Sequence, residues 1–321
     1  MKGSMLNGLY TDRYELAMAQ AYWKAGRARE PAVFDYFFRN CPFGGGYTVF
    51  AGLETLLDAL EQFYFEADHL EFLEEDGFDR AFLDWLEAFS FKGRIHAPRE
   101  GELVFPLEPV LRVEGGLLET QIAETLVLNI LNFQSLIATK ASRCRKSAGD
   151  RGLSEFGLRR AQGLGGMWAA RAACIGGFNT TSNSLAGHLY GLEITGTMAH
   201  AFVQSYDEEL AAFRAFADTH GSETVLLLDT YNTLQSGLPN AIQVARELLD
   251  RGESLTGVRL DSGDLAYLSK RVRAGLDEAG LEEVAIVASN QLDEYVIRSL
   301  LEQEAPIDLF GVGTALAVGQ P

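Results

Sequence analysis

From about residue 150 onward, short apolar segments alternate with stretches of helical character, and this alternation restricts the fold more than any other feature. The segments are continuously apolar, as expected of parallel strands covered on both faces. Parallel strands joined through helices build either an open sheet or a barrel, and seven segments favour a barrel or near-barrel. We expect the strands within LSEFG, CIGGFNTT, LEITGT, TVLLLDT, GVRLDSG, VAIVASN and IDLFGVG.

The region before residue 116 has mixed character. PAVFDYFFR (31–39) predicts a strand, and GRIHAP, GELVFP and PVLRVEG indicate a small antiparallel sheet. GLETLLDALEQFYF (52–65) and FDRAFLDWLEAFSF (78–91) have apolar residues at helical spacing, with Asp79 as a candidate N-cap. One long helical pattern follows up to Gly149 and ends in a basic cluster that suits a helix C-terminus.

These patterns divide the chain into an N-terminal α+β domain, 1–116, and an α/β barrel domain, 117–321, which begins with a long linking helix. The sequence stops just after a Gly-rich loop, so we expect the chain to be truncated at its C-terminus.

Charge and cysteine content exclude several classes of function. The net charge of −18 repels nucleic acid and anionic membrane surfaces. Three scattered cysteines form neither a disulfide framework nor a CxxC metal motif. The sequence has no signal-peptide pattern and no run of 18 apolar residues, and we therefore expect a cytoplasmic protein.

Polar residues and glycines gather at the ends of the expected strands. In a parallel barrel the loops that follow the strands converge on one face, and the chemistry lies there. The sequence thus predicts a site at this face, built from Glu155, Phe156, Arg159, residues 179–182, residues 195–197, His200, Asp229, Tyr231, Arg259, Asp261, Asp264, Ser289, Asn290, Gly311 and Gly313.

The strand end GVRLDSGDL carries the most charge. Ser262 or Asp264 is expected to cap the helix that begins near Leu265. Arg259 and Asp261 stand two residues apart on a strand and should point the same way. Such a pair suits a phosphorylated sugar, since the Arg grips anionic oxygens while the Asp holds hydroxyls or faces developing positive charge.

Other strand ends leave two interpretations open. Asp229 is a common turn residue, but with Asp261 it would stabilise an oxocarbenium-like centre or a Mg²⁺-phosphate complex. Ser182 either caps a helix or meets a substrate carboxylate, and no acidic residue lies between 175 and 192. His200 is either a paired core histidine or a member of the site.

Two Gly-rich loops are similarly ambiguous. FGVGT (310–314) predicts either a tight turn or a phosphate nest. NCPFGGGY (40–47) allows close approach to an anion, and Arg39 directly before it favours that interpretation.

Taken together and in order, the sequence motifs resemble the nicotinate phosphoribosyltransferase family over essentially the whole chain. They are GLYTDRYELAMAQAYW, FDYFFRNCPFGGGYTVFAGL, EFGLRRAQG, GGFNTTSNSLAG, GTMAHAF, LLLDTYNT, GVRLDSGDL, ASNQLDE and FGVGT. The resemblance implies the fold of a type II phosphoribosyltransferase, in which an N-terminal α+β sandwich domain joins an incomplete parallel α/β barrel. It implies a homodimer with shared active sites. It also implies formation of nicotinate mononucleotide and pyrophosphate from nicotinate and phosphoribosyl pyrophosphate, coupled to ATP hydrolysis with Mg²⁺.

The same resemblance implies roles for individual residues. His200 matches a histidine that is transiently phosphorylated, and Asp229 and Asp261 would lie near the ribose and the reacting centre. Phe156 would stack on the pyridine ring, with Tyr14 and Asp12 reaching it from the partner subunit. Arg259 would meet a carboxylate or phosphate. The implied phosphate-binding set is Arg39, Arg159, Gly311, Gly313 and Thr314, while metal ligands remain unassigned.

Ser182 distinguishes between related substrates. The nicotinamide enzyme has an aspartate at the matching position, whereas a serine suits nicotinate. The alternatives are a nicotinamide or quinolinate phosphoribosyltransferase of the same fold, and a truncated, non-catalytic homologue that binds nicotinate or a phosphosugar.

Overall fold

The computed structural model describes residues 6–320, which group into two units, Met1–Thr139 and Lys140–Pro321. The boundary between the units falls inside helix α6 (Glu124–Ala148). The domain limits expected from the sequence, 1–116 and 117–321, stay a prediction.

Two small antiparallel sheets organise the N-terminal unit. One has the strand order β1-β5-β3, and the other pairs β2 with β4. The helices near residues 52–65 and 78–91 and the antiparallel pairing of GRIHAP with PVLRVEG are therefore confirmed, but the strand in GELVFP belongs to the separate sheet with β2. The elements before α6 are α1 (Arg13–Lys24), β1 (Pro31–Tyr36), η1 (Pro42–Gly44), β2 (Thr48–Val49), α2 (Leu53–Glu61), α3 (Ala67–Glu75), α4 (Arg80–Glu87), β3 (Arg94–His96), β4 (Leu103–Val104), β5 (Leu111–Gly116) and α5 (Leu117–Ile122).

Local signals account for several of these boundaries. Asp79 caps α4, because its carboxylate accepts a hydrogen bond from the amide of Ala81 at 3.0 Å. The long helix expected up to Gly149 is instead divided into α5 and α6 at Ala123. The hydroxyl of Thr120 donates to the carbonyls of Gly116 and Leu117, and such back-bonding weakens the helical ladder close to this interruption.

The stretch Leu117–Ala148 is long and apolar enough to cross a membrane by length and composition alone. Most of its most apolar window is buried inside the protein, as in the core helix of a soluble protein. The stretch contains no uninterrupted run of 18 apolar residues, because scattered polar residues interrupt it.

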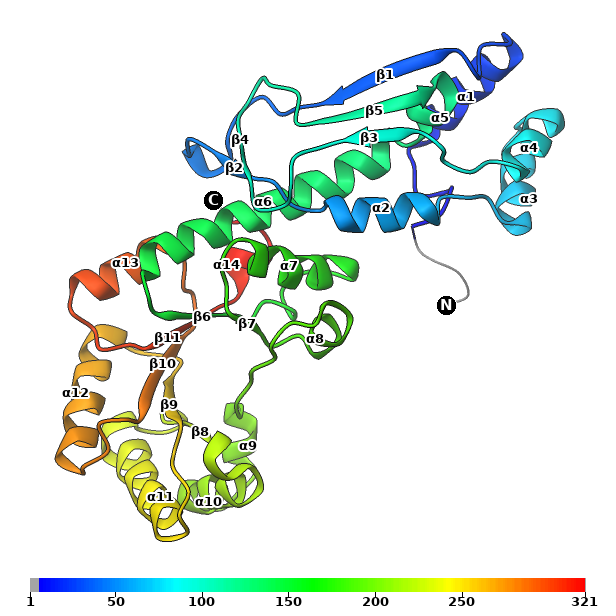
Figure 1. The fold of residues 1–321 in the computed structure, drawn as a ribbon. Coiled ribbons are helices and arrows are strands. Elements are labelled where there is room, and N and C mark those ends of the chain that lie inside the picture. Colours follow the sequence, from blue (N-terminus) through cyan, green and yellow to red (C-terminus); the bar gives the residue numbers. More distant parts are fainter. Residues whose placement is uncertain (1–5, 321) are drawn as a thin grey trace. The chain divides into compact units, whose positions relative to one another are not determined.

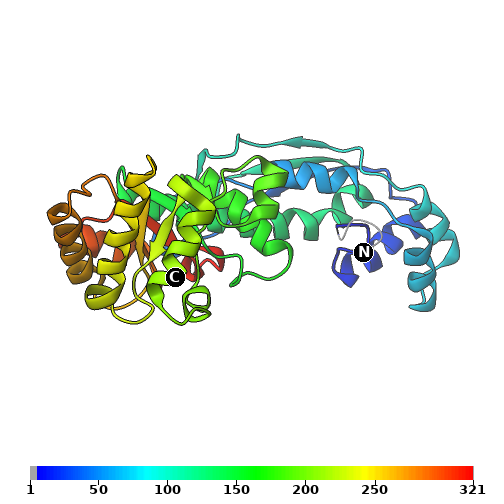
Figure 2. The same ribbon diagram turned by 90° about the horizontal axis from the view of Figure 1, so that it is seen from below.

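A six-stranded parallel sheet forms the centre of the C-terminal unit, in the order β7-β6-β11-β10-β9-β8. Helices lie along its outside, where α12 packs on β9 and β10 (Figure 1), and α11 and α12 lie side by side (Figure 2). The elements are β6 (Gly152–Glu155), α7 (Leu164–Ile175), β7 (Thr180–Thr181), α8 (Ser184–Tyr190), α9 (His200–Gln204), α10 (Glu209–His220), η2 (Gly221–Glu223), β8 (Val225–Leu227), η3 (Thr233–Gly237), α11 (Leu238–Asp250), β9 (Gly257–Leu260), α12 (Leu265–Glu278), β10 (Ala285–Ser289), α13 (Glu294–Glu302), β11 (Leu309–Val312) and α14 (Thr314–Ala317).

The prediction of a strand at LEITGT, the third of the seven expected segments, was wrong. Only an isolated parallel bridge, Thr181 to Ile194, forms there, and the Ile194 side chain is 58% exposed. The segment nevertheless touches both edge strands, since the amide of Thr195 donates to Thr181 of β7 and the Thr197 hydroxyl donates to Val225 of β8. A segment without apolar burial on two faces cannot complete the ladder, and the barrel is therefore incomplete at this point.

Candidate functional site

The loops after the strands enclose a cavity of about 390 Å³ in the C-terminal unit. Residues from β8 and β9 line it, together with residues that follow β6, β7 and β9, as the convergence of loops in a parallel barrel predicts. Eight of the predicted site residues meet there. They are Phe156, Arg159, Ser182, Gly196, Thr197, His200, Arg259 and Asp261.

Arg259 and Asp261 form an ion pair at the centre of this cavity. The two-residue spacing on β9 turns both side chains the same way, and Arg259 Nη2 donates to Asp261 Oδ1 at 2.9 Å. Arg259 Nε also donates to the hydroxyl of Ser289, at 2.8 Å, and Nη1 donates to the carbonyl of Met198. Three contacts therefore fix the plane of the guanidinium.

The pKa of Asp261 lies below its ordinary value. Burial by itself raises the pKa, but the hydrogen bond from Ser289, the charge and hydrogen bond of Arg259, and the charge of His200 together outweigh it. The carboxylate is therefore ionised at neutral pH and able to face developing positive charge.

His200 is the first residue of α9, and its side chain is 39% exposed. Nδ1 lies 3.1 Å from the Thr230 hydroxyl, and Nε2 lies 3.6 Å from Asp261 Oδ2. The reading of His200 as a fully buried core histidine is therefore wrong. Thr230, which comes directly after Asp229 in the loop that follows β8, had no predicted role.

Asp229 contacts the backbone of Asp261 and is not among the residues that line the cavity. Its Oδ2 accepts from the backbone amide of Asp261 at 3.0 Å and from the Ser262 hydroxyl at 2.5 Å. Its Oδ1 is buried and, among the described residues, has no hydrogen-bond partner. Asp229 thus holds the loop after β9 in place. At the end of that loop, Asp264 caps α12 by accepting a hydrogen bond from the backbone amide of Tyr267, as predicted.

Phe156 and Gly311 fit each other. The Phe156 amide donates to Val312, and a Cβ on Gly311 would lie 2.4 Å from a carbon of the Phe156 ring. The centre of the ring lies 5.8 Å from the Arg259 guanidinium carbon. Gly311 is therefore required for close packing. Gly313 precedes the short helix α14 and Thr314 begins it, and the predicted phosphate contacts of these three residues stay a prediction.

Glu155 holds the backbone around Ser182 in place. The backbone amide of Ser182 donates to the backbone carbonyl of Glu155 at 2.9 Å. The fully buried Glu155 side chain accepts from the Thr181 hydroxyl at 2.7 Å and from the amide of Gly157, and burial raises its pKa. The N-cap of α8 is Asn183, which rules out the alternative in which Ser182 caps this helix.

Three predicted site residues belong to the N-terminal unit. Asp12 and Tyr14 both contact the first turn of α6, since the Asp12 amide donates to the Thr125 hydroxyl and the Tyr14 hydroxyl lies 3.4 Å from Glu124. A hydrogen bond with Glu15, burial and nearby carboxylates raise the pKa of Tyr14. Tyr14 is half exposed, which leaves a ring face available for stacking.

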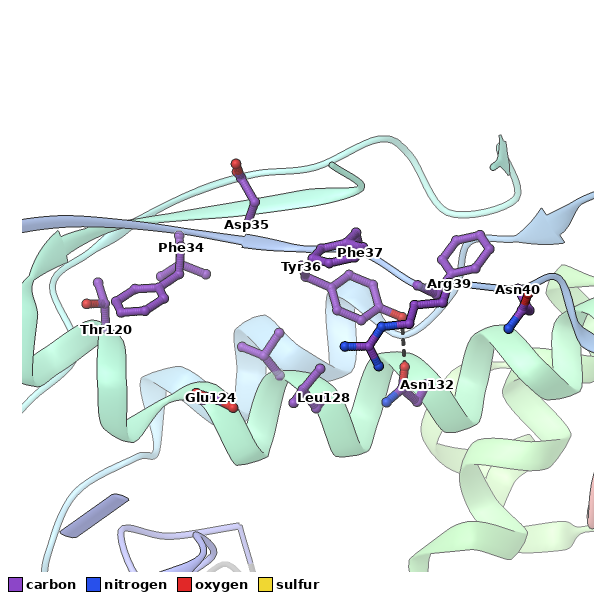
Figure 3. A pocket seen from close by; sticks show the side chains of 13 residues that line it. Phe34, Asp35, Tyr36, Phe37, Arg39, Asn40, Thr120, Glu124, Leu128 and Asn132 are labelled. Atoms are coloured by element: carbon purple, nitrogen blue, oxygen red, sulfur yellow. Dashed lines mark hydrogen bonds between the residues drawn. The ribbon is translucent and has the colours of Figure 1, made fainter. Parts of the chain in front are cut away.

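Arg39 lies in another part of the same unit, in a cavity of about 730 Å³ between β1 and α6. Figure 3 shows Tyr36 and Arg39 pointing toward α6, while Asp35 points away from it. The Tyr36 hydroxyl donates to Asn132 at 2.9 Å. Arg39 therefore faces an aromatic and polar cavity, and its phosphate-binding role stays a prediction.

One cluster in the described part of the chain has the spacing of a metal site: Glu66, Asp68 and His69. The first turn of α3 accounts for it, because His69 Nδ1 accepts from the Glu66 amide at 3.0 Å as part of a capping box.

The chain is similar to known proteins along almost its full length. Residues 9–132 match the family model described as the nicotinate phosphoribosyltransferase (NAPRTase) N-terminal domain. A nicotinate phosphoribosyltransferase of Bacillus subtilis is 50% identical over 98% of this chain, which spans 64% of that protein. One from Mycobacterium tuberculosis is 46% identical, again over 98% of this chain and 68% of its own length.

A solved structure agrees with these sequence relatives. Human nicotinic acid phosphoribosyltransferase aligns with a TM-score of 0.88 at 36% identity, over 94% of this chain and 72% of that one. The incomplete parallel barrel, with its cavity at the strand ends, is the fold of a type II phosphoribosyltransferase. Within that class, the chain belongs to the nicotinate phosphoribosyltransferase family.

Proposed function

We propose that this protein transfers the phosphoribosyl group of phosphoribosyl pyrophosphate to nicotinate, in NAD salvage. Nicotinate mononucleotide and pyrophosphate are the products, and ATP hydrolysis is linked to the transfer through a phosphorylated His200. The cavity that brings together Phe156, Ser182, His200, Arg259 and Asp261 carries this proposal. Family membership supports it.

The aromatic wall of the cavity suits a pyridine ring. Phe156 presents its ring there, and the Ser182 hydroxyl provides a neutral hydrogen-bond donor for the carboxylate of nicotinate. No acidic residue lies between 175 and 192, so no fixed negative charge on this loop repels that carboxylate.

The transfer itself breaks the bond between C1 of the ribose and pyrophosphate and forms one from C1 to the pyridine nitrogen. Positive charge develops on the ribose as pyrophosphate leaves. The ionised Asp261 stabilises that charge, and the guanidinium of Arg259 binds an anionic oxygen of the substrate.

His200 provides the link to ATP. A ring nitrogen attacks the terminal phosphorus, the bond to ADP breaks, and ADP leaves; water later releases inorganic phosphate from the histidine. Thr230 and Asp261, one beside each ring nitrogen, orient the imidazole for this step.

Mg²⁺ and a partner subunit belong to the same proposal. The buried Oδ1 of Asp229 fits a cation, since it has no hydrogen-bond partner among the described residues. Together with Asp261 it would hold Mg²⁺, which would neutralise charge on the pyrophosphate. In a homodimer, Tyr14 and Asp12 of one subunit would complete the site of the other.

The direct test is an assay of mononucleotide formation from nicotinate and phosphoribosyl pyrophosphate, with and without ATP. We expect formation of nicotinate mononucleotide and stimulation by ATP. Nicotinamide and quinolinate serve as competing substrates, and a clear preference for either would overturn the proposal. Binding of nicotinate without turnover would instead favour the non-catalytic alternative.

A further inference from the structure

The hydroxyl of Ser289, the last residue of β10, joins the two charged residues at the centre of the cavity. It accepts from Arg259 Nε at 2.8 Å and donates to Asp261 Oδ1 at 2.5 Å, while Arg259 Nη2 donates to the same oxygen. Three side chains thus close a ring of hydrogen bonds. Ser289 is 2% exposed and does not line the cavity, so it acts on Arg259 and Asp261 from behind.

This ring divides the two oxygens of Asp261 between different tasks. Ser289 and Arg259 both donate to Oδ1, whereas Oδ2 lies 3.6 Å from His200 Nε2. If the Ser289 hydroxyl were absent, the carboxylate could rotate, and Arg259 Nε would lose its partner in a buried setting.

The chain around Ser289 holds the hydroxyl firmly in place. Asn290 and Gln291 directly after it both have left-handed backbone angles, with φ of 81° and 49°. Non-glycine residues adopt this conformation at a cost, and two in succession persist only where the surroundings impose them.

The far end of this loop is equally restrained. Asp293 caps α13 by accepting from two backbone amides. The buried Glu294 pairs with Lys140 at 2.6 Å and with Arg143 at 2.7 Å. The loop is therefore anchored on both sides, and Ser289 has little freedom to move away from Arg259 and Asp261.

We propose that Ser289 is a positioning residue, which orients Asp261 so that one oxygen serves Arg259 while the other faces His200. The inference rests on the proposed function, because it assigns Ser289 to the transfer and to its link with ATP. Ser289 itself does not line the cavity and acts through Arg259 and Asp261.

The test compares Ser289→Ala with Ser289→Thr, which keeps the hydroxyl. Loss of two hydrogen bonds to charged groups predicts that Ser289→Ala lowers kcat about 10- to 100-fold. The KM for nicotinate is expected to change less than about threefold, because the ring pocket is left intact. Ser289→Thr should recover most of the lost kcat.

Ser269→Ala is the matched control for stability. Ser269 is also a fully buried serine, but its hydroxyl donates to Ala266 within α12, outside the cavity. We expect this variant to keep wild-type kcat. If Ser289→Ala also kept wild-type kcat, or if Ser269→Ala lost as much, the positioning role of Ser289 would be wrong.

A second readout does not depend on turnover. Arg259, His200, Asp229 and Ser289 are the groups that face Asp261, and only the Ser289 hydroxyl is removed in Ser289→Ala. A crystal structure of Ser289→Ala should therefore show the Asp261 carboxylate rotated, so that Oδ1 no longer meets Arg259 while Oδ2 faces His200. An unchanged carboxylate orientation would contradict the positioning role, whereas failure of the wild type to form mononucleotide would contradict only the proposed function.

Discussion

Two charged clusters in the C-terminal unit are built from similar residues and use them differently. In the cluster at the start of α13, Glu294 Oε2 pairs with Lys140 and Oε1 pairs with Arg143. In the cluster at the strand ends, Ser289 and Arg259 bind one oxygen of Asp261, and the other faces His200. Glu294 has both oxygens committed to cations, whereas Asp261 keeps one oxygen next to a titratable group.

The difference distinguishes a structural carboxylate from a functional one. Both groups have a pKa below the ordinary value, because hydrogen bonds and cations outweigh the opposing effect of burial. The direction of the shift therefore does not separate them, although perturbed pKa values are often used to find sites. What separates them is exposure: the Asp261 side chain is 25% exposed and lines a cavity, while that of Glu294 is 5% exposed.

The largest expected effect is on the stability of the structural cluster. Lys140→Met removes one cation from the buried Glu294, and breaking such a pair should lower the free energy of unfolding by about 3 kcal/mol. Urea-induced unfolding measures this change. Arg298→Met, which disturbs an exposed pair with Glu302 on the same helix α13, should cost less than about 0.5 kcal/mol. Equal effects of the two changes would remove the distinction.

The next effect concerns the functional cluster. His200→Ala should abolish stimulation by ATP, lowering the stimulated rate about 100-fold, and leave slow synthesis that does not need ATP. The loss follows from the missing nucleophile rather than from a change of fold, since His200 is partly exposed. Initial rates with and without ATP give the measurement. Equal loss of both activities would contradict the phosphohistidine role.

A smaller change is expected in substrate choice. Ser182→Asp places a carboxylate where nicotinate would present its own, and it offers an acceptor for the amide of nicotinamide. The ratio of kcat/KM for nicotinate to that for nicotinamide should fall about tenfold. Ser184→Asp, in the first turn of α8, adds the same charge outside the residues that line the cavity and serves as the control. A ratio unaffected by Ser182→Asp would refute this assignment.

The smallest effect is on acid stability. The pKa of Glu294 is lowered in the folded state, so its pairing stabilises the protein above the ordinary pKa of a glutamate and is lost as pH falls through the lowered value. Unfolding free energies measured between pH 5 and about pH 3 should therefore fall less steeply in Glu294→Gln than in the wild type. An unchanged slope would mean that Glu294 keeps its ordinary pKa in the folded protein.

Much of the fold could be predicted from local patterns. Six of the seven expected strands are present and parallel. Asp79 caps α4 and Asp264 caps α12, as their positions before helical patterns predicted. The two-residue spacing of Arg259 and Asp261 correctly predicted that the two side chains share a face. These successes depend on periodicity and capping, which act over a few residues.

The failures concern partners that are distant in sequence. LEITGT has the composition of a strand, but it forms only one isolated bridge, and the Ile194 side chain stays 58% exposed. Thr230 had no predicted role, and Ser289 was expected at the strand-end face without a partner, because no spacing in the chain relates either residue to His200, Arg259 or Asp261.

The sequence by itself determined the parallel strands, the face on which polar residues gather, and the similarity that defines the family, because each of these depends on residue type and order. Only the tertiary structure decided the strand order β7-β6-β11-β10-β9-β8, which brings β10 beside β9 and places Ser289 within reach of the charged pair. It likewise decided that Gly311 makes room for Phe156, and that Glu294 is a structural carboxylate while Asp261 faces a cavity. Such roles depend on which side chains come into contact across strands, and the order of residues along the chain does not show those contacts.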